Sequence, residues 1–77
     1  MKCTGYENYE TSNVVVWLFN DYPLYSIVLG YKKYPQPFLQ MRADLRETFG
    51  YKTTKDGVSL WDKGLDISAI DDAIREA

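Results

Sequence analysis

Apolar residues recur at helical spacing most clearly in the middle of the chain. They follow one stripe at positions i, i+3, i+7 and i+11: Phe38, Met41, Leu45 and Phe49. Pro37 suits the first position of a helix, because a first turn leaves its backbone N–H groups unbonded and proline has none. Gly50 readily adopts the left-handed conformation that ends helices. The pattern therefore predicts a helix that begins at Pro37 and stops at Gly50.

The apolar run at residues 14–19 is compatible with two structures. Its consecutive valines favour a strand, because β-branched side chains pack well on a pleated surface. Helical spacing nevertheless gives one coherent stripe: Val14, Trp17 and Leu18. We predict a helix over about residues 13–20, with Thr11 or Ser12 accepting hydrogen bonds from the backbone of its first turn.

A second helix is predicted directly after the first. Asp21 is a good cap, and Pro23 is tolerated in a first turn. We expect this helix over residues 22–29, ended by Gly30. Its apolar face consists of Leu24, Ile27 and Val28. Residues 31–36 then form a loop, since Pro35 disfavours helical geometry at the residue before it.

The last helix is predicted at the C-terminal end of the sequence. Three isoleucines form its apolar stripe: Ile67, Ile70 and Ile74. Asp66 or Ser68 can cap it. Asp71 and Asp72 suit its first turns, because the N-terminus of a helix carries partial positive charge.

Strand-like segments flank an Asp-Gly turn signal between these helices. Residues 51–54 and 58–61 lie on either side of Lys55-Asp56-Gly57, a pattern typical of a β-hairpin. A lone hairpin is only marginally stable, so it would need to pack on the helices. The expected fold is mostly α with a small β-hairpin (α+β), in the order α-α-α-β-β-α, as one compact domain over residues 1–77.

Composition agrees with one folded domain. The chain has 77 residues, of which 45% are hydrophobic, and this argues against disorder. Aromatic residues make up 16%, a high share that helps a short chain to build a core and also suits an interface. Cys3 is the sole cysteine, whereas small secreted domains usually carry several. The first residues lack the apolar region of a signal peptide. We therefore expect a cytoplasmic protein that does not enter a membrane.

Few groups in the sequence suit catalysis. It has no histidine, which removes the commonest general base near neutral pH and the usual ligand of transition metals. Cys3 would need a positioned activating base to act as a nucleophile. Four acidic residues lack the spacing of an EF-hand and are better explained as caps and solvated groups: Asp62, Asp66, Asp71 and Asp72. We expect no enzyme activity, metal or cofactor, unless two carboxylates converge in a deep cleft.

Charge is unevenly distributed along the chain. Residues 32–55 carry six basic and two acidic residues, a net charge of +4, whereas residues 56–77 carry two basic and six acidic residues, a net charge of −4. We favour neutralisation of the basic segment by this acidic segment within the fold. The alternative is a nucleic-acid contact, with Tyr31 and Tyr34 near two of the lysines. Its candidate residues are Lys32, Lys33, Arg42, Arg46 and Lys52.

One face of the predicted first helix is typical of an interface. Asn13, Trp17, Asn20 and Asp21 lie at i, i+4, i+7 and i+8, and Tyr9 and Tyr25 extend the face. A tryptophan ringed by amide and phenol groups resembles an interaction hot spot. The candidate binding residues are Tyr9, Asn13, Trp17, Asn20 and Tyr25. The alternative is that Trp17 belongs to the core while the asparagines cap or satisfy backbone groups.

The same segment resembles a known family. It reads Asn8-Tyr9-Glu10-Thr11-Ser12-Asn13-Val14-Val15-Val16-Trp17. This is similar to the Asn-Tyr-Glu-Thr-Trp-Asn-Val-Ala-Leu-Trp opening of small uncharacterised proteins of tailed phages and their bacterial hosts. Residues 20–21, 24–25, 56–58, Trp61 and 65–66 continue the similarity. This sequence departs from the pattern at Ser12, where the family has tryptophan, and at Val15 and Val16.

The resemblance implies an accessory phage-type protein and a helical first motif, and it supplies no catalytic residues. Together with the candidate face, it predicts a small interaction module that binds a host or phage protein. A second copy of this chain is a candidate partner, because a short aromatic-rich chain can expose apolar surface that a dimer covers. Binding of nucleic acid through residues 32–55 is the alternative.

Overall fold

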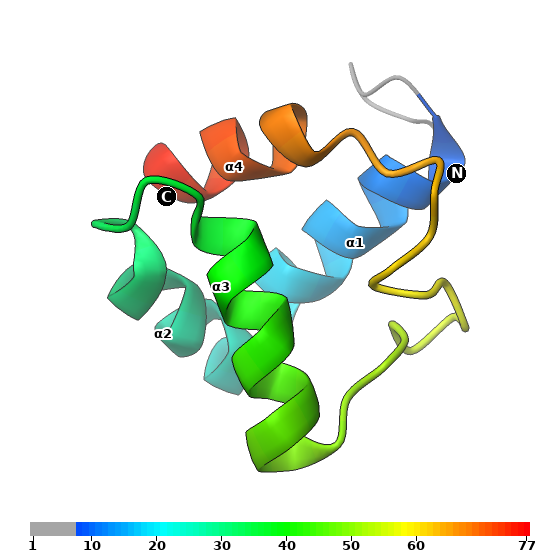
Figure 1. Ribbon diagram of the computed structural model, residues 1–77, viewed down its shortest axis with the longest axis horizontal. Coiled ribbons are helices and arrows are strands. Elements are labelled where there is room, and N and C mark those ends of the chain that lie inside the picture. The colour runs from blue at the N-terminus through cyan, green and yellow to red at the C-terminus, as the bar shows by residue number, and fades with distance from the viewer. Residues whose placement is uncertain (1–7) are drawn as a thin grey trace.

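Helices are the regular secondary structure of the described residues. The computed structural model describes residues 8–77 (Figure 1). Its elements, in chain order, are α1 (Tyr9–Asn20), α2 (Tyr22–Tyr31), α3 (Pro37–Asp44), the π-helical turn η1 (Leu45–Phe49) and α4 (Ile67–Arg75). The segment between η1 and α4 crosses from the far end of α3 back to the start of α1. Among residues 8–77, no helix has the length and apolar character needed to cross a bilayer.

The predicted hairpin and the α-α-α-β-β-α order are wrong. Across residues 8–77 the structure contains no strand, and residues 51–61 form only one isolated antiparallel bridge, between Thr53 and Ser59. The Asp-Gly turn itself is present, with Gly57 at a φ of 90° and its N–H bonded to the carbonyl of Thr54 at 3.0 Å. The flanks fail to extend because Gly50 ends a helix on one side and a new turn begins at Ser59 on the other. The fold is therefore helical rather than α+β.

The helix predicted at residues 13–20 begins earlier than expected. Asn8 caps α1 and accepts a hydrogen bond from the backbone N–H of Thr11 at 2.9 Å, so the predicted caps at Thr11 and Ser12 are wrong. Both of these side chains are fully buried inside the helix. The hydroxyl of Thr11 instead accepts a hydrogen bond from the backbone N–H of Asp66 at 2.9 Å, and this ties α1 to the start of α4.

The second helix confirms its predicted start but not its end. Asp21 caps α2 by accepting from the N–H of Leu24 at 3.2 Å. Gly30 lies within the helix, which continues to Tyr31. An ideal Cβ at Gly30 would meet no atom within 4 Å, so no crowding requires a glycine at this point. The prediction that Gly30 ends the helix is therefore wrong, and α2 ends two residues later than the predicted residue 29.

The third helix has the predicted bounds, but its last turn is unusual. It begins at Pro37, and Gly50 follows η1 with a φ of 75°. Phe38, Met41 and Leu45 are buried as predicted, whereas Phe49 is 52% exposed. A π-helical turn holds more residues than an α-helical one, so it rotates the residues that follow away from the stripe. Phe49 is therefore a surface residue, and its predicted place in the core is wrong.

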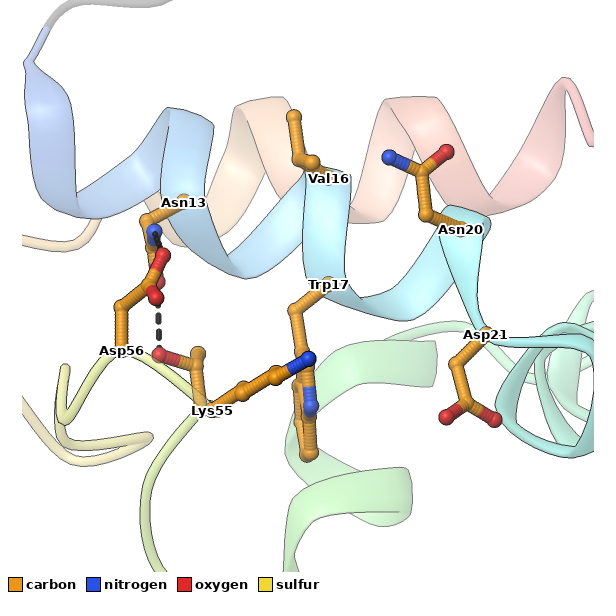
Figure 2. A pocket seen from close by; sticks show the side chains of 8 residues that line it. Asn13, Val16, Trp17, Asn20, Asp21, Lys55 and Asp56 are labelled. Carbon is orange, nitrogen blue, oxygen red and sulfur yellow. Dashed lines mark hydrogen bonds between the residues drawn. The ribbon is translucent and has the colours of Figure 1, made fainter. Parts of the chain in front are cut away.

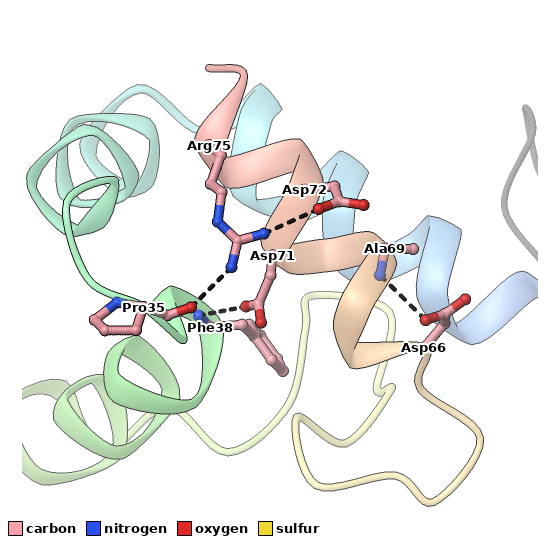
Figure 3. Close-up of polar contacts among 7 residues, drawn as sticks. All are labelled: Pro35, Phe38, Asp66, Ala69, Asp71, Asp72 and Arg75. Carbon is pink, nitrogen blue, oxygen red and sulfur yellow. Dashed lines mark hydrogen bonds and ion pairs between the residues drawn. The ribbon is translucent and has the colours of Figure 1, made fainter.

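A side chain from α4 completes the start of α3. Gln36 makes no capping hydrogen bond, but buried Asp71 accepts one from the N–H of Phe38 at 2.9 Å (Figure 3). Arg75 donates to the carbonyl of Pro35 at 2.7 Å in the same region. The carboxylate of Asp71 thus serves the N-terminus of a neighbouring helix rather than its own, where negative charge is favourable.

The four helices enclose one apolar core. Its buried residues are Val14, Val15, Leu18, Leu24, Val28, Phe38, Met41, Leu45, Leu60, Leu65, Ile70 and Ile74. Leu60 and Leu65 come from the connection between η1 and α4, which anchors that irregular segment to the helices. Three predicted stripe positions, at Trp17, Ile27 and Ile67, pack at the edge of this core and are only partly buried.

Candidate functional site

A groove of about 270 Å³ runs between α1 and the turn that follows residue 53 (Figure 2). Its lining residues are Asn13, Val16, Trp17, Asn20, Asp21, Thr54, Lys55 and Asp56. The indole of Trp17 projects from α1 into this space, with Lys55 and Asp56 on the facing segment. A second hollow of about 290 Å³ shares Trp17, Asp21, Thr54 and Lys55 with the groove and reaches Tyr51.

Asn13 holds the two walls of the groove together. Its Nδ2 donates to the hydroxyl of Tyr9 at 3.2 Å and to Oδ2 of Asp56 at 2.8 Å. Its Oδ1 accepts from the hydroxyl of Thr54 at 2.6 Å. The side chain is 3% exposed, and both amide hydrogens are already used. Asn13 therefore shapes the groove from inside and is not available to bind a ligand.

Three aromatic rings form a connected surface beside the groove, which we call the aromatic ridge: Trp17, Tyr51 and Phe49. Trp17 meets the ring of Tyr51 edge-on, with centroids 5.9 Å apart. Tyr51 stacks on Phe49 with centroids 5.5 Å apart and an interplanar angle of 18°. Phe49 is 52% exposed and Tyr51 is 41% exposed, whereas Trp17 is half-buried against the core. The sequence analysis did not predict that Phe49 and Tyr51 belong to this surface, because it assigned Phe49 to the core and Tyr51 to a strand.

The structure assembles most of the predicted binding face but not all of it. Trp17 and Asn20 line the groove, and exposed Tyr9 reaches it through its hydrogen bond to Asn13. Tyr25 does not join them, because its ring packs against Phe19 with centroids 5.6 Å apart. Trp17 is partly buried against the core and also lines the groove, so its predicted role at an interface stays a prediction.

The residues of the nucleic-acid alternative separate into two groups. Arg42 and Arg46 place their guanidinium carbons 5.0 and 4.9 Å from the ring centroid of Trp61. Lys52 lies near them, since its carbonyl accepts from the N–H of Leu60 at 2.9 Å. The other two lysines lie at the opposite end of α3 (Figure 1): Lys32 donates to the carbonyl of Ala77, and Lys33 lies over the ring of Tyr34.

Direct neutralisation of the basic segment by the acidic one does not occur in the described part of the chain. Its only ion pair joins Arg75 and Asp72 within α4, at 2.9 Å. Burial lowers the pKa of Arg42 below its ordinary value, and its Nη1 donates to the carbonyl of Leu60 at 3.0 Å. The favoured expectation of internal pairing is therefore wrong at the level of ion pairs.

The acidic residues near the C-terminal end have structural partners. Asp66 caps α4 through the N–H of Ala69 at 3.1 Å, Asp71 caps α3, and Asp62 accepts from the N–H of Gly64 at 2.7 Å. Ser68 makes no cap, so Asp66 is the correct choice of the two. Within residues 8–77 no three metal-ligating side chains gather. Cys3, the candidate nucleophile, lies outside the described residues.

Residues 8–17, for which the sequence analysis predicts a relation to phage proteins, lie in α1 apart from its cap Asn8. Their departure at Ser12 falls on a fully buried position, where the hydroxyl has no hydrogen-bond partner. A tryptophan there would need space that the core around α1 does not hold, so the family's pattern would require different packing at this point. Comparison of this chain with protein-family models, with curated proteins and with solved structures found no significant match.

Proposed function

We propose that this protein is a small protein-binding module whose partner docks on the aromatic ridge and the adjoining groove. One observation carries the proposal: three rings contact one another in series beside a groove, and two of them, Phe49 and Tyr51, are exposed. Connected aromatic side chains on a surface are typical of interaction hot spots, because they offer large contact areas at low entropic cost.

The groove favours an extended peptide segment as the part of the partner that it binds. Trp17 provides an apolar floor, and Asp21, Lys55 and Asp56 provide a polar rim of both signs. Asp56 is held by Asn13, and Asp21 by the N–H of Leu24, so two of these rim groups are already fixed in place. A preorganised rim reduces the entropy lost on binding. An apolar side chain of the partner would rest on the indole while its backbone meets the rim.

The resemblance of residues 8–17 to phage-type proteins supports a host or phage protein as the partner. The single cysteine of the sequence fits a reducing compartment such as the bacterial cytoplasm. The acidic residues near the C-terminal end accept hydrogen bonds from the backbone of helices and turns. Because these carboxylates already have structural partners, we favour a binding function over a catalytic one. A second copy of the chain is the other candidate partner, because exposed aromatic surface is often covered in dimers.

Capture from a bacterial lysate tests the proposal when matched variants are compared. Phe49→Ser removes an exposed ring of the ridge, and Leu29→Ser removes a comparably exposed side chain of α2 that does not line the groove. We expect one partner to be retained by the wild-type protein and by Leu29→Ser but lost by Phe49→Ser. Equal retention by both variants would exclude the ridge. Sedimentation at several concentrations shows whether the same substitution abolishes self-association.

A further inference from the structure

Two arginines and a tryptophan form a second surface cluster, none of whose residues lines the groove. Arg42 and Arg46 lie one helical turn apart across the junction of α3 and η1. Both guanidinium groups lie over the indole of Trp61, which is itself 37% exposed. Arg42 is further fixed by its hydrogen bond to the carbonyl of Leu60. We call Arg42, Arg46 and Trp61 the arginine–indole cluster.

No carboxylate neutralises this cluster within residues 8–77. The only ion pair there is on α4, so none of the acidic residues that neighbour the cluster in sequence (Asp44, Glu47 and Asp62) forms an ion pair with it. Asp44 accepts a hydrogen bond from the hydroxyl of Tyr31, and Asp62 accepts one from the N–H of Gly64. Two like charges at i and i+4 repel each other, and this repulsion is offset by the indole of Trp61 and, for Arg42, also by the ring of Phe38 at 5.7 Å.

A third cation lies beside the cluster. The backbone of Lys52 is bonded to Leu60, the residue next to Trp61, and Lys52 is exposed without an ion-pair partner in the described chain. Two guanidinium groups therefore lie over one partly exposed aromatic ring, and a third basic residue adjoins them in the fold. A single carboxylate would leave most of this charge uncompensated, whereas a phosphate group or successive phosphates would balance it. Guanidinium groups also match the geometry of phosphate oxygens, which they bind with two parallel hydrogen bonds.

We propose that the arginine–indole cluster is a binding site for phosphate esters, with Arg46 and Lys52 contacting phosphate oxygens and the exposed edge of Trp61 packing against the attached base or sugar. The phosphate belongs either to a nucleic-acid strand or to a free nucleotide. The site shares no residue with the aromatic ridge and does not depend on the protein-binding proposal. Lys32 and Lys33, at the other end of α3, are not part of it.

Fluorescence anisotropy with a labelled single-stranded oligothymidylate at low salt tests the site. Arg46→Gln is the main variant, because Arg46 is exposed and makes no hydrogen bond to the backbone. Lys33→Gln is the matched control, with the same loss of charge on an exposed residue outside the cluster. We expect Arg46→Gln to weaken binding about tenfold or more and Lys33→Gln to change it less than about twofold, since a charged hydrogen bond to phosphate is lost only in the first.

Three further results decide the matter. Arg46→Lys keeps the charge but loses the planar fork, so affinity between that of the wild type and that of Arg46→Gln is expected. A mononucleotide and an unlabelled oligonucleotide are then compared as competitors at equal phosphate concentration. Equal competition identifies a free nucleotide as the source of the phosphate. Much weaker competition by the mononucleotide identifies a nucleic-acid strand. The proposal is overturned if the oligonucleotide does not bind, if the two Gln variants lose equal affinity, or if polyglutamate competes as well as phosphate. Capture through Phe49 is expected to survive Arg46→Gln, so failure of one proposal leaves the other standing.

Discussion

Trp17 and Trp61 are both partly exposed, yet their surroundings differ in kind. Trp17 projects from a regular helix, packs on the core and touches the neutral ring of Tyr51. Trp61 lies within a turn of the irregular connection and under two guanidinium groups. One indole thus offers an apolar contact with a polar rim, and the other offers an aromatic surface within positive charge. The same residue type therefore lies in two surface environments of different chemistry.

The two tryptophans also differ in what holds them. The backbone of Trp17 is fixed by the hydrogen bonds of α1, and its side chain packs against the core. Trp61 is positioned by buried Leu60 beside it and by the two arginines that cover it. Loss of Trp17 should consequently damage stability more than loss of Trp61, and the predictions below test this difference.

Trp17→Ala is expected to have the largest effect. Complete loss of a buried tryptophan costs roughly 3–5 kcal/mol, and the partial exposure of Trp17 places the expected cost near the lower end, about 3 kcal/mol. Urea denaturation followed by circular dichroism measures it. A cost below that of Trp61→Ala would contradict the assignment of Trp17 to the edge of the core.

Asn13→Ala should come next, at about 2 kcal/mol, because it leaves the buried hydroxyl of Thr54 without its acceptor and releases Asp56. The turn at residues 54–58 should then detach from α1. Hydrogen exchange of the Val58 amide, which donates to the hydroxyl of Thr54, is the local readout. Unchanged protection there would show that the groove keeps its shape without Asn13.

Trp61→Ala is expected to cost about 1 kcal/mol, since each exposed cation–π contact contributes roughly 0.5–1 kcal/mol and the repulsion between the arginines partly remains. The same denaturation experiment measures it. Added phosphate should raise the stability of the wild-type protein more than that of this variant. Equal stabilisation of both proteins by phosphate would show that Trp61 does not contribute to the phosphate site proposed at the arginine–indole cluster.

The smallest effect concerns pH and lies outside both tryptophan surfaces. The hydrogen bond from Tyr31 to Asp44 raises the pKa of the Tyr31 phenol to about 12 in the folded protein, and burial adds to the shift. A phenol in an unfolded chain titrates near about 10, so the stabilisation is complete below that pH and is lost as the pH rises toward about 12. Tyr31→Phe should remove this part of the pH dependence. Urea midpoints of both proteins across that range give the difference, and parallel curves would contradict it.

Prediction from the sequence succeeded where the forces act within one or two helical turns. Pro37, Gly50, Asp21 and Asp66 mark helix ends because each acts on backbone groups a few residues away. The apolar stripes found most of the core for the same reason. The start of α1 was missed although its signal was local, because Asn8 precedes two other plausible caps.

Contacts between distant residues set the rest. Asp56 meets Asn13 across 43 positions, and Asp71 caps Phe38 across 33. No pattern within a segment shows such pairings, so Asn13 looked like a surface amide and Asp71 like a cap of its own helix. The hairpin failed because its flanks are needed elsewhere, with Thr54 bonded to α1 and Leu60 buried in the core.

By itself, then, the sequence determined where helices form and which side chains leave water, since periodicity and capping are properties of neighbouring residues. Only the tertiary structure decided that Phe49 and Tyr51 join Trp17 at the surface, and that Arg42 and Arg46 converge on Trp61. These surfaces arise when packing of the core brings remote segments together. The pattern of residues within one segment does not indicate which distant segment it will contact.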